Sequence, residues 1–296
     1  MSDVEPTIAH PSILVDRVSA GYRGHEVARH LSLSIERGSR TALVGPNGSG
    51  KSTILKTLAR LIKPLSGSVY LNGQDIGRLP TREVARQLAI LPQVHEVPPE
   101  LTVLELVSQG RFPHVGALKM LRRQDDEAVQ EAIRLTGLEH LMHRSVDTLS
   151  GGEHQRAWMA LALAQKTDLL LLDEPTTFLD VAHQLDLLGL VSGLNRDHGV
   201  TVVIVLHDLN HAARFADRMI AVLEGEVVAD GPPTEVLTPG LLRECFGVEA
   251  WVTKDPETGA PVCIPHTTIS AGNDEGEGGV GRGHGRPGSS SGHPRP

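Results

Sequence analysis

The chain has 296 residues and is 40% hydrophobic, which is enough for a globular core in one large or two modest domains. Its formal net charge is −8 and it has no dense run of Lys or Arg, so nothing in it favours nucleic acid as a partner. Its two cysteines, Cys245 and Cys263, lack C-x-x-C spacing, so neither a disulfide framework nor a zinc site is predicted. A reduced compartment fits this cysteine usage.

The first half of the expected core, residues 13–93, is rich in predicted strands, with alternating polarity at Leu31–Glu36. No apolar segment of the chain approaches the ~18–20 residues that cross a bilayer. The N-terminal segment also lacks the basic-then-apolar order of a signal peptide. We therefore expect a folded protein without a membrane span of its own.

The segment "GPNGSGKS" at Gly45–Ser52 follows a predicted strand, Thr41–Val44, and precedes a predicted helix, Lys51–Leu61. Its glycines let backbone N–H groups surround a phosphate chain, and the helix N-terminus adds a partial positive charge. Lys51 would reach the β- and γ-phosphates, and the Ser52 hydroxyl would ligate Mg²⁺. A glycine-rich turn alone would not explain a Lys-Ser pair at this point. The predicted nucleotide contacts are Gly45, Pro46, Asn47, Gly48, Ser49, Gly50, Lys51, Ser52 and Thr53.

The predicted secondary structure changes from strands to helices in residues 94–148, because apolar residues there recur at the spacing of helices. At the end of this stretch lies "LSGGE", Leu149–Glu153, in which Ser150 can cap a helix that begins at Gly151. Gly151 and Gly152 leave the start of that helix without side chains, so it offers a second anion site. The chain thus carries two half-sites for a triphosphate.

The apolar run Leu169–Leu172 is typical of a strand that is buried on both faces of a parallel sheet. It ends in Asp173 and Glu174, at the strand end that faces the ligand crevice of such sheets. Asp173 is placed to hold Mg²⁺, and Glu174 to orient and polarise an attacking water. The alternative is a strand that stops in a solvated polar turn; the phosphate loop favours the catalytic interpretation.

A fourth segment, "LHD" at Leu206–Asp208, completes an ordered set with the three above. On these motifs the chain resembles the nucleotide-binding subunit of an ATP-binding-cassette (ABC) transporter. The resemblance implies that two copies pack head to tail, each holding ATP and Mg²⁺. It also implies that Ser150, Gly151 and Gly152 of one copy close over the ATP of the other.

Further residues match functional positions of the family. The resemblance implies that Tyr22 stacks on adenine and that Gln93 touches Mg²⁺ and senses the membrane partner. It assigns Asp180 to a loop that crosses the dimer interface, and His207 to the γ-phosphate. Without the resemblance, Tyr22 would be read as an ordinary packing residue, Gln93 as an exposed turn residue and His207 as a structural histidine.

The resemblance also implies the fold class and the domains. We expect an α/β phosphate-loop NTPase with a strand-rich RecA-like core, an antiparallel β part and a helical subdomain at about 94–165. The ATP-binding domain would span 13–247, followed by a C-terminal extension at 248–268. Residues 269–296 are rich in Gly, Ser and Pro and are predicted to be disordered.

The branch of the family is indicated by "EPTTFLDVAHQLDLL" at Glu174–Leu188 and "QGRFPH" at Gln109–His114. They resemble the importers of ferric-siderophore complexes and, more distantly, those of cobalamin and haem, with Phe178 and His183 as branch markers. A DNA-repair or chromosome ATPase would need a coiled-coil insertion longer than the gap between Gln93 and Leu149. A translation-associated cassette protein would carry a second phosphate loop, and none occurs.

The expected function is therefore ATP hydrolysis that energises a membrane importer of ferric siderophores, with cobalamin or haem import, or a non-transport ABC ATPase, as alternatives. The resemblance implies a homodimer, integral-membrane permease subunits and, indirectly, a substrate-binding protein. It places the chain peripherally at the cytoplasmic face of the membrane.

Overall fold

Continuous apolar runs form the central strands of a six-stranded sheet in the computed structural model, which describes residues 11–22, 24–93, 100–115, 127–177 and 179–269. The strand order is β10-β9-β3-β8-β7-β6, and all neighbours are parallel except β9 and β10. The strands are β3 (Arg40–Val44), β6 (Leu88–Leu91), β7 (Leu169–Asp173), β8 (Thr201–Val205), β9 (Arg218–Leu223) and β10 (Glu226–Gly231). Parallel strands carry their carboxyl ends to one edge, where ligands bind.

Both faces of this sheet are covered, as the predicted strand Leu169–Leu172 requires. Leu170 and Leu172 pack into one apolar cluster, with α8 (Val181–His198) and α9 (Leu209–Phe215). Leu169 and Leu171 point the other way, into a cluster with α1 (Lys51–Leu58). The period of two along β7 thus separates the two layers of the core.

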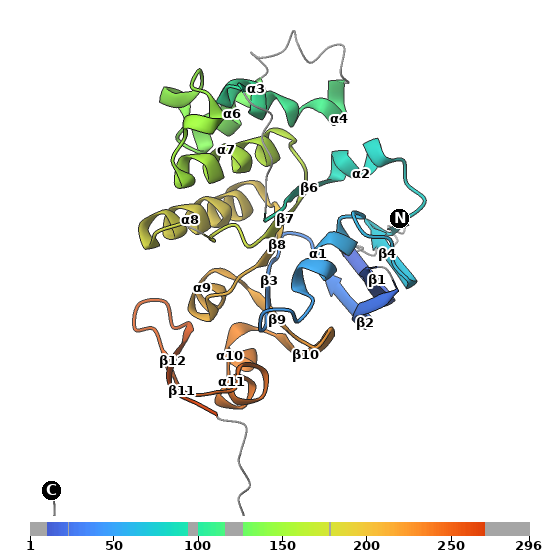
Figure 1. Ribbon diagram of the computed structural model, residues 1–296, viewed down its shortest axis with the longest axis vertical. Helices are drawn as coiled ribbons and strands as arrows, with labels where there is room; N and C mark the ends of the chain where they lie inside the picture. Colours follow the sequence, from blue (N-terminus) through green and yellow to red (C-terminus); the bar gives the residue numbers. More distant parts are fainter. Residues whose placement is uncertain (1–10, 23, 94–99, 116–126, 178, 270–296) are drawn as a thin grey trace, which may run out of the picture.

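An antiparallel sheet of order β2-β1-β4-β5 covers α1 on its far side (Figure 1). Its strands are β1 (Ile13–Tyr22), β2 (His25–Ile35), β4 (Ser66–Leu71) and β5 (Gln74–Asp75). The helix predicted to reach Leu61 ends at Leu58, because Arg60 adopts a left-handed backbone with φ 58°. A helix cannot continue through that conformation.

Helices fill the part of the chain between β6 and β7, and they form an apolar cluster of their own. They lie together at one end of the molecule in Figure 1. They are α3 (Val103–Gln109), α4 (Phe112–Val115), α6 (Glu127–Leu135), the 3-10 turns η1 (Glu139–Leu141) and η2 (Val146–Thr148), and α7 (Gly151–Ala164). The short α2 (Thr81–Gln87) precedes β6. α7 joins the clusters, since Met159 belongs to the sheet's core and Ala160 to the helical one.

The expected extension at 248–268 is a β-hairpin, β11 (Val248–Lys254) and β12 (Pro261–Thr268), which follows α10 (Pro233–Val236) and α11 (Pro239–Phe246). It lies at the opposite end of the molecule from the helical part (Figure 1). Ala250 and Cys263 of the hairpin belong to the main core cluster. Asn210 accepts a hydrogen bond from the Cys263 N–H (2.8 Å) and donates one to the Cys263 carbonyl (3.2 Å). The hairpin is therefore packed on the core.

Within the described ranges, no helix combines the length and the apolar character that crossing a bilayer requires. The tail predicted to be disordered lies outside the described residues from 270 onward, as does Phe178.

Candidate active site

The phosphate-loop glycines are required by their surroundings. Gly45 has φ 148°, and a Cβ there would lie 2.1 Å from the carbonyl oxygen of Val222. Gly50, the N-cap of α1, has φ 104°, and a Cβ would lie 3.2 Å from the Val27 carbonyl oxygen. No side chain caps α1, so its first N–H groups face the loop. Such a loop and helix start bind anions.

Lys51 is buried over this loop. Its ammonium donates to the carbonyl oxygens of Gly45 (2.9 Å) and Pro46 (2.8 Å), which hold it above the peptide groups that would surround a phosphate. Burial lowers the pKa of Lys51, and the nearby Glu174 and Asp173 oppose that shift. A phosphate at this point would add negative charge beside a largely desolvated cation.

Asp173 and Ser52 present oxygen atoms side by side. The Ser52 hydroxyl donates to Asp173 Oδ1 (2.7 Å), while Asp173 Oδ2 is buried and makes no hydrogen bond within the described part of the chain. The nearest cation to that oxygen is Lys56 Nζ, at 3.9 Å. Burial raises the pKa of Asp173. An incompletely paired carboxylate beside a hydroxyl is the donor set that Mg²⁺ prefers, so these residues fit the ion.

Glu174 meets residues from the two neighbouring strands. Its Oε2 lies 2.7 Å from His207 Nε2 and accepts a short hydrogen bond from the Gln93 amide. Gln93 follows β6, Glu174 follows β7 and His207 follows β8, and these strands are adjacent in the sheet. These two contacts, with a longer hydrogen bond from the Thr177 hydroxyl (3.5 Å), converge on one carboxylate oxygen and fix the direction of the acid.

Glu174 is also held in an unusual backbone conformation, with φ 52°. A side-chain-bearing residue in this region costs about 1–3 kcal/mol and persists where the surrounding structure determines it. The turn after β7 aims the carboxylate back toward the phosphate loop. A cavity of ≈ 170 Å³ lies between them, and its lining residues are Val27, Asn47, Gly48, Gly50, Lys51, Ser52, Thr53 and Glu174.

Three other predicted site residues do not line this cavity. Tyr22 is 49% exposed at the end of β1, and Asp180 caps α8 through hydrogen bonds to His183. Ser150 accepts from the Glu153 N–H and donates to the Glu153 carboxylate, a capping box at the start of α7. None of the three lines the cavity at the phosphate loop.

Sequence reasoning missed Val27 and Lys56. Val27 comes from β2 of the antiparallel sheet and closes the cavity over Gly50. Its only signal in the sequence is its place in a predicted strand, which does not say what the strand covers. Lys56 lies one turn after Ser52 on α1, and its spacing is the signal that places it near the same carboxylate.

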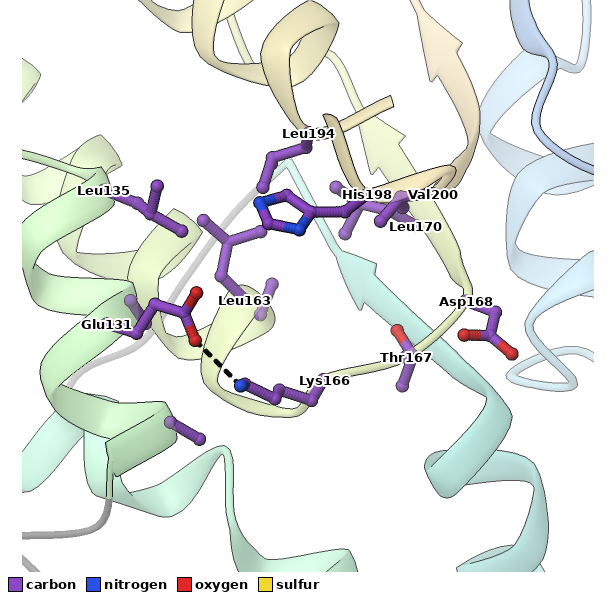
Figure 2. A pocket seen from close by; sticks show the side chains of 13 residues that line it. Glu131, Leu135, Leu163, Lys166, Thr167, Asp168, Leu170, Leu194, His198 and Val200 are labelled. Atoms are coloured by element: carbon purple, nitrogen blue, oxygen red, sulfur yellow. Dashed lines mark ion pairs between the residues drawn. The ribbon is translucent and has the colours of Figure 1, made fainter. Parts of the chain in front are cut away.

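A larger cavity, ≈ 310 Å³, lies at the opposite, amino-terminal ends of β7 and β8. In Figure 2, Glu131 of α6 points across it to Lys166, which follows α7; the ion pair is 2.7 Å long. His198 and Leu194 at the end of α8 line another wall. It contains none of the predicted site residues, so we do not assign the nucleotide to it.

A largely parallel α/β sheet with a glycine-rich loop before a helix and an acidic pair at a neighbouring strand end defines a phosphate-loop NTPase. The family model described as "ABC transporter" matches residues 28–177, and the chain belongs to this family. It is therefore an ABC ATPase, and the predicted family and fold class are confirmed.

Two curated relatives cover most of the chain. The chain is 46% identical to the iron(3+)-hydroxamate import ATP-binding protein of Bacillus subtilis (strain 168), over 87% of this chain and 96% of that protein. It is 47% identical to the ferric enterobactin transport ATP-binding protein of Escherichia coli (strain K12), over 84% and 92%. Its fold matches a dimeric, post-hydrolysis ATP-binding cassette bound to ADP and Pi, with TM-score 0.67, 31% identity and coverage of 74% and 98%.

Proposed function

We propose that this ATPase is the energising subunit of a membrane importer for ferric-siderophore complexes, acting as a homodimer that holds two ATP molecules at its interface. The substrate class is supported by relatives named for iron(3+)-hydroxamate import and ferric enterobactin transport, which match 87% and 84% of this chain. The observation that carries the ATPase site is the convergence of Gln93, Glu174 and His207 beside the phosphate loop.

In this proposal the chain's own residues divide the work. The loop N–H groups and Lys51 bind the phosphates, and Ser52, Asp173 and Gln93 supply oxygen ligands to Mg²⁺. When bound, Mg²⁺ neutralises charge on the β- and γ-phosphates. The Glu174 carboxylate, oriented by His207 and Gln93, accepts a proton from the attacking water. We expect His207 to contact the γ-phosphate.

The second copy completes each site. The helix α7 starts at Ser150, Gly151 and Gly152, none of which lines the cavity at the chain's own phosphate loop. We expect this helix start to close over the ATP of a partner. Asp180 would lie in the loop that crosses the interface. Tyr22 has a separate role, in which it would stack on adenine. Because the γ-phosphate is then bound from both sides, ATP favours the closed dimer and ADP does not. That difference in affinity is what a population shift requires.

The chain divides into an ATP-binding domain, a helical insertion and a C-terminal hairpin. Residues 13–247 form the ATP-binding domain, with the helical part, about 94–165, inserted in it. We expect permease subunits in the membrane, a substrate-binding protein that delivers cargo to them, and a place for this chain at the cytoplasmic face. The hairpin at 248–268 adds to the core of the domain.

Uptake of radiolabelled ferric siderophores by native cells tests the substrate, with radiolabelled cobalamin and haem in parallel. Cells carry the wild-type chain, Glu174→Gln, or Glu226→Gln, which changes an exposed carboxylate on the edge strand β10. We expect Glu174→Gln alone to abolish ferric-siderophore uptake. Selective loss of cobalamin or haem uptake would support the ATPase role but show that the transported substrate is cobalamin or haem. Unchanged uptake of all three would contradict the importer role.

A further inference from the structure

The imidazole of His183 lies against the second glycine of the "LSGGE" segment. A Cβ built on Gly152 would lie 3.2 Å from His183 Cδ2, 3.4 Å from Cγ and 3.5 Å from Nε2. Gly152 lies in the first turn of α7 and does not have the left-handed backbone that favours glycine. The crowding at this position comes from the His183 ring.

His183 is tied to the turn that begins α8. Its Nδ1 lies 2.7 Å from Asp180 Oδ1, and its backbone N–H donates to the same oxygen at 2.9 Å. The side-chain amide of Gln184 donates to the backbone carbonyl of Leu179 (3.0 Å) in the same turn. A Cβ at position 152 would require the ring to move by a few tenths of an ångström, and this movement would act directly on its 2.7 Å bond to Asp180.

Gly151, one residue earlier, is a natural contrast. A Cβ at Gly151 would meet no atom of the described chain within 4 Å. The two glycines therefore differ in what surrounds them within one copy: open space at Gly151, and the His183 ring at Gly152.

We propose that His183 is a positioning residue that couples the start of α7 to the Asp180 turn, so that the segment facing the partner's ATP and the segment crossing the interface keep one spacing. This inference rests on the proposed ATP-bound dimer. Gly152 is then required because a side chain there would push His183 and, through it, Asp180. The side chains of His183 and Asp180 are 41% and 66% exposed, so the link lies at the surface where a partner can reach it.

A double-mutant cycle on the full-length chain tests the coupling. The kcat and KM of ATP hydrolysis are measured for Gly152→Ala, for His183→Ala and for the variant that carries both changes. A matched control cycle replaces Gly152→Ala by Gly151→Ala, alone and combined with His183→Ala. We expect Gly152→Ala to lower kcat by about tenfold, with KM for ATP within about twofold of wild type, and His183→Ala to recover most of that loss. In the Gly151 cycle we expect the two effects to add.

A conservative variant separates positioning from folding. The side-chain amide of His183→Asn can replace Nδ1 and keep the bond to Asp180, so we expect it to retain kcat better than His183→Ala at equal thermal stability. If Gly152→Ala fails to fold, folding of the double variant would support the contact. If both fail, equal kcat for His183→Asn and His183→Ala would overturn the proposal.

Other outcomes are equally decisive. If Gly152→Ala is as harmful without His183 as with it, the partner's nucleotide alone excludes the side chain, and His183 has no positioning role. Failure of the proposed function itself would look different. Binding of a fluorescent ATP analogue would then be unchanged in Lys51→Ala, whatever the result of the His183 cycle.

Discussion

Glu174 combines a left-handed backbone with a carboxylate oxygen that is contacted from both neighbouring strands. A glutamate whose only task was to end a strand would need neither feature. One oxygen of the neighbouring Asp173 is buried and makes no hydrogen bond among the described residues, which costs stability. Both residues are arranged for a ligand.

We expect Glu174→Gln to leave ATP binding intact and to lower hydrolysis by at least about 100-fold, because the amide cannot accept a proton from water. Without hydrolysis, ATP should hold the dimer closed. Phosphate release and size-exclusion chromatography with ATP measure both effects, and Glu226→Gln is the control. Hydrolysis at the native rate would remove Glu174 from the catalytic role.

Asp173→Asn should stabilise the nucleotide-free protein while it abolishes hydrolysis. Burial raises the pKa of Asp173 in the fold, so its ionised form is disfavoured there. The wild type is therefore penalised increasingly as pH rises from the ordinary carboxyl range through that raised pKa. At pH 7.5 the melting temperature of the variant should exceed that of the wild type, by about 2–4 °C for each kcal/mol gained in the free energy of unfolding. The difference should shrink as pH falls; a gap that grows on acidification would contradict it.

At the scale of elements, α3 and α7 begin with the same device. Thr102 and Glu105 form a capping box at α3, and Ser150 and Glu153 form one at α7. In both boxes the hydrogen bonds to the cap lower the pKa of the glutamate. Only α7 continues from the cap into two glycines, which leave its N-terminus open to an anion.

Thr102→Ala and Ser150→Ala should each lower the free energy of unfolding by about 1 kcal/mol, since each removes an N-cap. Only Ser150→Ala should also lower ATP hydrolysis, by about tenfold or more, because Ser150 is the cap proposed to reach the partner's ATP. Denaturant unfolding and steady-state hydrolysis measure the two effects. Equal hydrolysis in both variants would show that Ser150 is a cap and nothing more.

At the scale of the whole molecule, the hairpin of β11 and β12 is part of the folded domain. Cys263 of the hairpin and Cys245 of α11 are free and buried, and burial raises the pKa of both thiols. Native protein should thus react slowly with iodoacetamide at either site. The two cysteines report on different contacts of this end of the molecule.

Asn210→Ala should release the hairpin, because it removes both hydrogen bonds to the Cys263 backbone. We expect a loss of about 1–3 kcal/mol in the free energy of unfolding. Alkylation of Cys263, read by mass spectrometry, should accelerate relative to Cys245, which serves as the internal control. Equal acceleration at both thiols would indicate global unfolding.

Local features of the fold could be predicted from the sequence alone. The spacing of Gly45, Gly50 and Lys51, the apolar run before Asp173 and the cap at Ser150 each express a conformation of a few consecutive residues. Such patterns predicted the phosphate loop, the buried strand and the start of α7. The order of the motifs predicted the family.

The contacts between those segments depend on tertiary packing and could not be predicted from the sequence. Gln93, Glu174 and His207 converge because β6, β7 and β8 are neighbours, and the pairing of strands so distant in sequence is set by packing of the whole sheet. The same holds for Val27 over Gly50 and for the hairpin on α9. The contact of His183 with Gly152 joins two helix starts by the same means, because local propensity carries no information about which distant side chain fills the space beside a glycine.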